Sequence, residues 1–360
     1  MNLLKCFKTF KQLVLIDFLA VDRKHILLLK LVPRTKVFWF FMDNPQKING
    51  DFKGKDIVSL DQFSKKDIYI LFSNTSKMKN LVQKKGGSTL LKGKIMCAIF
   101  YEPSSRTFGS FITSMQRLGG GFIPLQGMGN SSVAKGETLE DTMQTFSSYS
   151  DVIVIRHPER GTAKIAANAT EIPVINAGDG IGEHPTQALL DLYTIQEEFG
   201  KLDNLTGVFA GDMLHGRTVK SLLRGLSLFK NNTCYLLSPK ELKLSREDFN
   251  DFQRRGIKII EIKNYSDIPK NAHFWYWTRI QKERFENFKD YEKVKNIFIL
   301  TKRLLDTYGN SKMILMHPLP RVNEIEKEID SDTRAVYLKR QMKNGMYLRM
   351  ALLALVLGKI

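Results

Sequence analysis

The sequence predicts an α/β protein with two doubly wound parallel-sheet domains, the C-terminal helix packing back on the first domain. Three observations support this prediction. Short apolar runs alternate with longer amphipathic runs along the chain, which is typical of parallel sheets with helices on both faces. The length of 360 residues suits two domains. The last 15 or so residues are almost wholly apolar, so they must be buried.

The apolar runs that we expect to form strands are short and end in polar or glycine-rich segments. In chain order they cover residues 95–101, 152–155, 172–176, 208–210, 233–237, 257–262, 273–277 and 313–316. The amphipathic runs carry apolar residues three and four positions apart, which predicts helices. These runs cover residues 108–118, 185–199, 217–228, 241–255 and 346–357.

The helix expected at 185–199 separates two series of alternating strands and helices, so we place a domain boundary near residue 185. The first domain then covers residues 46–185 and the second covers residues 186–339. Residues from about 340 to 360 are expected to return to the first domain, because their helix is apolar on all sides around Arg349.

Residues 1–45 form an N-terminal extension of unknown role. Lysines precede an apolar run, but Asp17 interrupts that run, which makes a poor signal peptide. The segment is basic but lacks the serines of a transit peptide. The compartment expected is therefore the cytoplasm, or an organelle if this extension is a targeting segment.

Composition narrows the classes of function. Lys and Arg number 55 against 37 Asp and Glu, a net charge of +18, which suits either nucleic-acid binding or an enzyme of anionic substrates. The lysines are scattered, which favours the enzyme. Three distant cysteines, Cys6, Cys97 and Cys234, indicate neither a disulfide framework nor a zinc site. No run of 18 apolar residues is present, so we expect no membrane-spanning helix.

An anion site is predicted directly after the first strand. The run 95–101 leads into Ser104, Ser105, Arg106 and Thr107, and an amphipathic stretch follows at once. Hydroxyls, a guanidinium and the free N–H groups of a helix start therefore converge at one strand end. Such a combination binds phosphate well.

Other strands also end in cationic or hydrogen-bonding groups, and doubly wound sheets bind ligands at that edge. These segments are 156–158, 176–187, 211–218, 278–284 and 317–321. Arg106, Arg156, Arg217 and Arg279 all fall there. Guanidiniums gathered in one cleft repel one another unless anions fill it, so the substrates should carry a phosphate and carboxylates. The histidines lack metal-ligand spacing, and the glycines at 178–182 lack dinucleotide spacing, so no metal or nucleotide cofactor is expected.

Together these motifs resemble the aspartate carbamoyltransferase family, in the expected order over about residues 45–360. The matching strings are FYEPSSRT at 100–107, KGET at 135–138, IRHP at 155–158, the loop and helix at 176–191, GRT at 216–218, TRIQKER at 278–284 and HPLPRV at 317–322. The resemblance implies transfer of the carbamoyl group of carbamoyl phosphate to the amino group of L-aspartate. That reaction is an early step of de novo pyrimidine biosynthesis and needs no cofactor.

The resemblance also implies roles for individual residues. Carbamoyl phosphate would be bound by Ser104, Ser105, Arg106, Thr107, Ser131, Arg156, His184, Gln187, Leu319 and Pro320. Aspartate would be bound by Lys135, Arg217, Arg279 and Gln281. The catalytic residues would be Arg106, Thr107, His184 and Lys135. Glu102 would tie the two domains together on closure, through Arg217 and Arg284.

The family further implies a homotrimer, in which the loop carrying Ser131 and Lys135 reaches the neighbouring subunit's active site. Its partners would be the two small-molecule substrates, without nucleic acid or membrane.

Two alternatives stay open. Ornithine carbamoyltransferase shares the phosphate loop, but it should carry His-Cys-Leu-Pro at 317–320, and paired arginines repel ornithine. A basic nucleic-acid-binding protein with the same fold is the alternative from another class.

Overall fold

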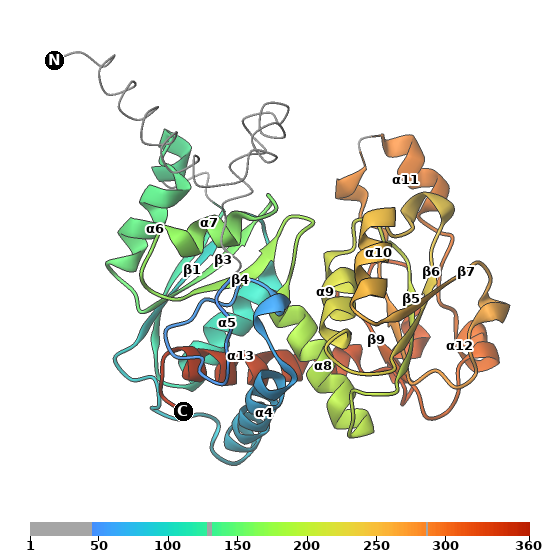
Figure 1. The fold of residues 1–360 in the computed structure, drawn as a ribbon, viewed down its shortest axis with the longest axis horizontal. Coiled ribbons are helices and arrows are strands. Elements are labelled where there is room, and N and C mark those ends of the chain that lie inside the picture. The colour runs from blue at the N-terminus through green and yellow to red at the C-terminus, as the bar shows by residue number, and fades with distance from the viewer. Residues whose placement is uncertain (1–44, 128–131, 286) are drawn as a thin grey trace, which may run out of the picture. The chain divides into compact units, whose positions relative to one another are not determined.

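The computed structural model describes residues 45–127, 132–285 and 287–360 (Figure 1). Residues 1–44, which make up nearly all of the predicted extension, lie outside the described residues. Within the described ranges, no helix is both long and apolar enough to cross a membrane.

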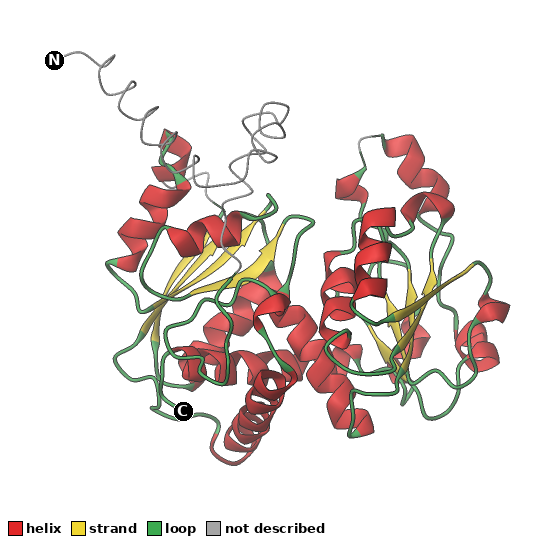
Figure 2. Ribbon diagram, viewed as in Figure 1, coloured by secondary structure: helices red, strands yellow, loops and turns green. Residues whose placement is uncertain are grey.

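Two sheets follow one another along the chain, and all their strand pairs are parallel. The first sheet has the order β2-β1-β3-β4, with strands Gly121–Gln126, Ile95–Phe100, Val152–His157 and Val174–Asp179. The second has the order β7-β6-β5-β8-β9, with strands Lys258–Ile262, Thr233–Leu237, Thr206–Ala210, Phe274–Trp277 and Ile314–Met316. We call the part around the first sheet lobe 1 and the part around the second lobe 2. The predicted fold class is confirmed (Figure 2).

Helices cover both faces of the sheets (Figure 2). The α-helices are α4 (Lys65–Lys85), α5 (Ser105–Arg117), α6 (Leu139–Ser147), α7 (Thr162–Asn168), α8 (Pro185–Phe199), α9 (Arg217–Leu226), α10 (Arg246–Arg254), α11 (Phe288–Val294), α12 (Lys302–Tyr308) and α13 (Met342–Val356). The short helical turns are η1 (Leu60–Gln62), η3 (Ser132–Lys135), η4 (Lys240–Leu242), η5 (Tyr265–Asp267), η6 (Lys282–Arg284), η7 (Lys327–Ser331) and the π-helical η8 (Tyr337–Gln341).

Strand residues alternate between two hydrophobic cores, as the period of two along a strand requires. In β1, Met96 and Ala98 join the large core that also contains residues of α4, α5, α8 and α13. Cys97 and Ile99 face the other way, into a smaller core with residues of α6 and α7. Lobe 1 therefore has three layers, with helices on both faces of its sheet. The helices cover the faces of the sheet and not the carboxyl ends of its strands.

The last helix, α13, returns to lobe 1 as predicted. It packs against α4, α5 and α8, and residues 347–356 are all buried (Figure 1). Because α13 follows lobe 2 in the chain, this return brings the C-terminal segment beside the first sheet. It also carries Arg349 next to α5 and the start of α8.

Several elements differ from the predicted ones. Helix α4 was not predicted, although Ser64 and Asp67 form a capping box at its start and Gly86 ends it. Strand β2 was not predicted either; it is an edge strand, which tolerates Pro124 because one side of its backbone needs no partner. The predicted helix 241–255 is divided: Lys240–Leu242 forms η4, and Ser245 caps a separate α10.

Candidate functional site

A cavity of about 920 Å³ lies where strands of both sheets end. It is lined by the segments that follow β1, β4, β5, β8 and β9, as expected for doubly wound sheets. The predicted site residues in its lining are Glu102, Ser104, Ser105, Arg106, Thr107, Arg156, His184, Gln187, Arg217, Arg279, Gln281, Leu319 and Pro320. Residues from 102 to 320 in the sequence are thus brought to one place.

The start of α5 supplies the predicted anion site. Ser104 precedes the first turn and makes no side-chain cap bond, so its hydroxyl does not occupy the N–H groups of that turn. Arg106 and Thr107 lie in the turn and line the cavity. Partial burial and the nearby charge of Arg279 lower the pKa of Arg106. The contribution of Arg279 to that shift indicates that a cation of lobe 1 and a cation of lobe 2 lie near each other.

Glu102 joins the two lobes through arginines. Its Oε2 lies 2.6 Å from Arg156 Nη2 and 3.1 Å from Arg217 Nη2, and its Oε1 lies 3.5 Å from Arg284 Nη2. Arg156 belongs to β3 in lobe 1, whereas Arg217 and Arg284 belong to lobe 2. Arg217 Nη1 also donates to the carbonyl oxygen of Gly180 at 2.7 Å. Arg284 does not line the cavity, but besides facing Glu102 it donates to the same Gly180 carbonyl oxygen at 3.3 Å.

His184 is a buried, neutral imidazole beside two of these arginines. Burial first, and then the charges of Arg217, Arg156 and Arg349, lower its pKa well below the ordinary value of 6.5. Its Nδ1 has no hydrogen-bond partner among the described residues, although the atom is buried. Burial likewise lowers the pKa of Arg156 to about 9, helped by Arg217 and opposed by Glu102. A neutral imidazole nitrogen and a guanidinium therefore face the same part of the cavity.

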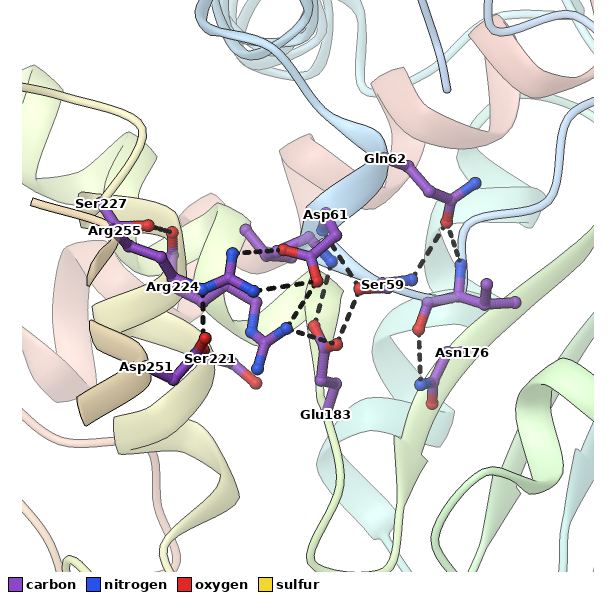
Figure 3. Close-up of polar contacts among 12 residues, drawn as sticks. Ser59, Asp61, Gln62, Asn176, Glu183, Ser221, Arg224, Ser227, Asp251 and Arg255 are labelled. Carbon is purple, nitrogen blue, oxygen red and sulfur yellow. Dashed lines mark hydrogen bonds and ion pairs between the residues drawn. The ribbon is translucent and has the colours of Figure 1, made fainter. Parts of the chain in front are cut away.

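The loop that carries His184 is anchored by the preceding residue. The Glu183 carboxylate accepts hydrogen bonds from Ser59 Oγ at 2.7 Å and from the Leu60 N–H at 3.0 Å. Figure 3 shows this carboxylate beside Asp61, with Arg224 facing both. Arg224 Nη1 lies 2.6 Å from Asp61 Oδ2 and 3.6 Å from Glu183 Oε1. Because Arg224 is on α9, the His184 loop is held between the start of lobe 1 and a helix of lobe 2.

The segment after β9 is fixed by His317. The Leu319 N–H donates to His317 Nδ1 at 2.8 Å, so Nε2 carries the imidazole proton. Nε2 then donates to Glu324 Oε1 at 2.8 Å. Leu319 has a positive φ of 55° and precedes a cis peptide bond to Pro320. The His317 imidazole thus links the backbone of Leu319 to the carboxylate of Glu324, which fixes the loop between them. Leu319 and Pro320, within this loop, line the cavity.

Among the predicted substrate-binding residues that the structure describes, one does not line the cavity. Lys135 ends η3 and is exposed, apart from the cavity lining. Ser131 lies outside the described residues. The remaining aspartate-binding candidates do line the cavity, with Gln281 Nε2 donating to the carbonyl oxygen of His215 at 3.4 Å.

Arg349 on α13, for which the sequence predicted no role in the site, also lines the cavity. Its Nη1 donates to Ser110 Oγ at 3.1 Å and its Nη2 to Thr186 Oγ1 at 3.3 Å. Burial lowers its pKa to about 10, opposed by Asp191. The signal was present in the sequence, because a single charge in an otherwise apolar buried helix must find polar partners.

The charges of the cavity indicate what it can bind. Arg106, Arg156, Arg217, Arg279 and Arg349 line it, and Glu102 is the single carboxylate in the described lining. Such a lining suits a ligand with several negative charges, including planar carboxylates or a phosphate. Across the described ranges, no group of three or more His, Cys, Asp or Glu side chains could hold a metal ion.

Two family profiles match most of the chain. "Aspartate/ornithine carbamoyltransferase, carbamoyl-P binding domain" matches residues 55–197, and "Aspartate/ornithine carbamoyltransferase, Asp/Orn binding domain" matches residues 203–356.

Relatives and solved structures agree with these profiles. The multifunctional protein pyr1-3 of Dictyostelium discoideum is 49% identical over 85% of the chain, but the chain spans only 14% of that protein. The aspartate carbamoyltransferase catalytic subunit of Methanocaldococcus jannaschii is 44% identical, over 83% of the chain and 96% of the relative. The structure of aspartate transcarbamoylase from Trypanosoma cruzi with carbamoyl phosphate and aspartate is 38% identical. It covers 87% of this chain and all of its own, with a TM-score of 0.79.

Proposed function

The chain belongs to the aspartate/ornithine carbamoyltransferase family, and we propose that it transfers the carbamoyl group of carbamoyl phosphate to the amino group of L-aspartate. The products would be N-carbamoyl-L-aspartate and phosphate, in an early step of de novo pyrimidine biosynthesis. The observation that carries the proposal is the cavity at the strand ends of both lobes, where arginines from both lobes surround a single carboxylate.

Carbamoyl phosphate would bind on the lobe 1 side. Its phosphate would accept hydrogen bonds from the first turn of α5 and from the side chains of Ser105, Arg106 and Thr107. Its carbonyl oxygen would face Arg156 and His184. Because His184 is neutral, it would act as a hydrogen-bond donor or a polar neighbour and not as a second cation.

L-aspartate would bind on the lobe 2 side, with its carboxylates on Arg217 and Arg279 and with Gln281 beside them. Its neutral amino group would attack the carbamoyl carbon and form the new C–N bond. The negative charge that develops on the carbonyl oxygen would be stabilised by Arg106, Thr107 and His184. The C–O bond to phosphate would then break, and the departing phosphate would take the bonding electron pair and accept the amine proton. The residues of the chain supply orientation and charge complementarity.

The segment after β9 favours aspartate over ornithine as the acceptor. Pro318 stands where an ornithine enzyme would be expected to carry a cysteine, and a proline has neither a thiol nor an N–H group. Arg217 and Arg279 also repel a cationic side chain. A solved relative, the Trypanosoma cruzi structure with carbamoyl phosphate and aspartate, is an aspartate transcarbamoylase.

We further propose a homotrimer with shared sites, and this proposal addresses the position of Lys135. An exposed lysine at the end of η3, apart from the cavity of its own chain, suits delivery to a neighbouring subunit's cavity. Ser131 precedes the same turn in the sequence and would travel with it. The predicted domain boundaries, near residues 185 and 340, stay predictions as well.

The proposed activity is tested with purified protein, carbamoyl phosphate and either L-aspartate or L-ornithine. We expect N-carbamoyl-aspartate and no citrulline. Citrulline would show that the Arg279 and Pro318 region has been misread, and no product from either amine would refute carbamoyl transfer by this chain. The trimer is tested separately, by measuring the mass of the protein in solution and by mixing inactive Lys135→Ala and Arg106→Ala chains. Shared sites predict that the mixture regains activity.

A further inference from the structure

Asp191 is a fully buried carboxylate that the mechanism above does not use. It lies on α8, four residues after Gln187, and does not itself line the cavity. Its Oδ1 accepts hydrogen bonds from Gln187 Nε2 at 3.0 Å and from Gln341 Nε2 at 2.7 Å. Its Oδ2 accepts one from Tyr276 Oη at 2.8 Å. Donors from α8, η8 and β8 thus converge on one carboxylate next to the site.

We propose that Asp191 is a positioning residue that turns the amide of Gln187 so that its oxygen faces the carbamoyl NH₂ group. This inference rests on the proposed function. An ionised carboxylate only accepts hydrogen bonds, so the Gln187 amide must present its NH₂ group to Asp191. The other end of that amide, Oε1, is then left for the cavity that Gln187 lines.

This arrangement gives the site a means of recognising the carbamoyl group. A carbamoyl NH₂ can donate a hydrogen bond to Gln187 Oε1, whereas the methyl group of acetyl phosphate, which has nearly the same shape, cannot. A site that offers an acceptor to a ligand without a donor leaves that acceptor unpaired, which weakens binding. Asp191 would therefore determine selectivity between two acyl phosphates without touching either.

Gln341 reinforces the same polarity on the other side of Asp191. It donates its NH₂ to Asp191 and accepts the His317 N–H at 3.1 Å with its own oxygen. Both amides therefore have the orientation that an ionised Asp191 requires. A protonated Asp191 would introduce an O–H donor into a place where three donors already point.

The ionisation of Asp191 should consequently affect selectivity. Burial raises its pKa to about 7, and the hydrogen bonds from Tyr276, Gln341 and Gln187 and the charge of Arg349 on α13 oppose the rise. The carboxylate is ionised above that pH and protonated below it. The preference for carbamoyl over acetyl phosphate should therefore be stronger at about pH 8.5 than at about pH 6.

The first experiment compares the wild-type protein with Asp191→Asn. The measured quantities are the KM for carbamoyl phosphate and the inhibition constant of acetyl phosphate, both with L-aspartate as acceptor. An Asn side chain can donate to Gln187 Oε1 and so lets the amide turn round. We expect the KM for carbamoyl phosphate to rise about tenfold to a hundredfold, with the inhibition constant of acetyl phosphate changed less than about threefold. Equal weakening of both ligands, or no change, would overturn the proposal.

The second experiment does not depend on the folding of Asp191→Asn. The ratio of the two constants is measured from about pH 6 to about pH 8.5 in the wild type and in Tyr276→Phe. Both ligands carry the same phosphate group, so its titration cancels in the ratio. Tyr276→Phe removes the hydrogen bond that Tyr276 donates to Asp191, together with a polar contact between the Tyr276 hydroxyl and the Gln187 side chain. Because the lost donor favoured the ionised form of Asp191, the pH at which selectivity falls should rise. A wild-type ratio that stays constant over this range contradicts the inference. Absence of wild-type turnover would instead contradict the proposed function.

Discussion

Replacing Glu102 with Gln tests whether one carboxylate holds the two lobes in the arrangement that binds aspartate. The change keeps the size of the side chain and one oxygen acceptor but removes the charge that faces three arginines. Two of those arginines, Arg217 and Arg284, belong to lobe 2. The substitution therefore weakens contacts across the cavity while leaving the backbone after β1 unchanged.

The size of the effect follows from these contacts. A hydrogen bond to a charged partner contributes about 1 kcal/mol more than a neutral one. The Arg217 contact at 3.1 Å should lose about that much, and the Arg284 contact at 3.5 Å should lose about half of it because it is longer. The sum of about 1.5 kcal/mol corresponds to roughly a tenfold rise in the KM for L-aspartate. Complete burial would make the loss larger, but the Glu102 side chain is 23% exposed.

The assay varies L-aspartate at saturating carbamoyl phosphate and also records the unfolding temperature of each protein. Glu261→Gln is a matched control, because that carboxylate pairs with Lys243 on the surface of lobe 2, with both side chains about one-third exposed. It should leave the KM for aspartate unchanged. If Glu102→Gln and the control give the same KM as the wild type, within about twofold, the reasoning about lobe contacts is refuted.

Three further predictions concern single residues. Arg106→Ala should lower kcat about a hundredfold or more, because it removes an oxyanion donor. It should not lower the unfolding temperature, because it also relieves repulsion between cations in the cavity. Normal turnover would rule out this role of Arg106. Burial alone would raise the pKa of Asp61, but hydrogen bonds and charges from Arg255 on the segment after α10, 2.7 Å away, and from Arg224, 2.6 Å away, lower that pKa overall. The stability that Asp61 contributes is therefore full above its ordinary pKa of 3.8 and lost as pH falls through the folded value. Asp61→Asn should accordingly lower the free energy of unfolding at neutral pH but not in acid, as denaturant titrations at both would show. Gly178→Ala should reduce activity more than Gly54→Ala. Both glycines have positive φ, but only a Cβ at position 178 would approach Arg156 Nη1, to 2.8 Å. Equal activities of the two variants would contradict this prediction.

The sequence predicted the bounds of helices and strands well where residues that start and end an element stand next to it in the chain. The helix predicted at 185–199 has the bounds of α8, because Pro185 starts it and Gly200 ends it in the left-handed conformation. The strand predicted at 233–237 has the bounds of β6. The omission of α4 was avoidable, since its capping box and its terminal glycine are both visible in the sequence. The omission of β2 was harder to avoid, because Pro124 argues against a strand until the edge position is known.

Some residues of the candidate site could be predicted from the sequence and others could not. Residues directly after strands could be placed together from the sequence, because parallel strands all end at the same edge of their sheet. Asp191, Gln341 and Arg349 could not, since each lies within a helical segment. The apolar pattern of the last helix predicted its return to lobe 1. It did not specify which residues of α13, η8 and α8 would lie next to the cavity, because that depends on how these helices pack against one another.

The way in which the cavity arginines are held explains how the site can stay attractive to anions. Arg156 Nη1 donates to the Ala177 carbonyl oxygen at 3.1 Å, and Arg217 Nη1 donates to that of Gly180 at 2.7 Å. A carbonyl oxygen orients a guanidinium but does not neutralise it, whereas a carboxylate does both. Glu102 supplies one negative charge to three arginines, so a net positive charge remains after the protein's own contacts are made. The cost of burying that excess is visible in the lowered pKa values of Arg156 and Arg217, and a phosphate and two carboxylates are the groups that would offset it.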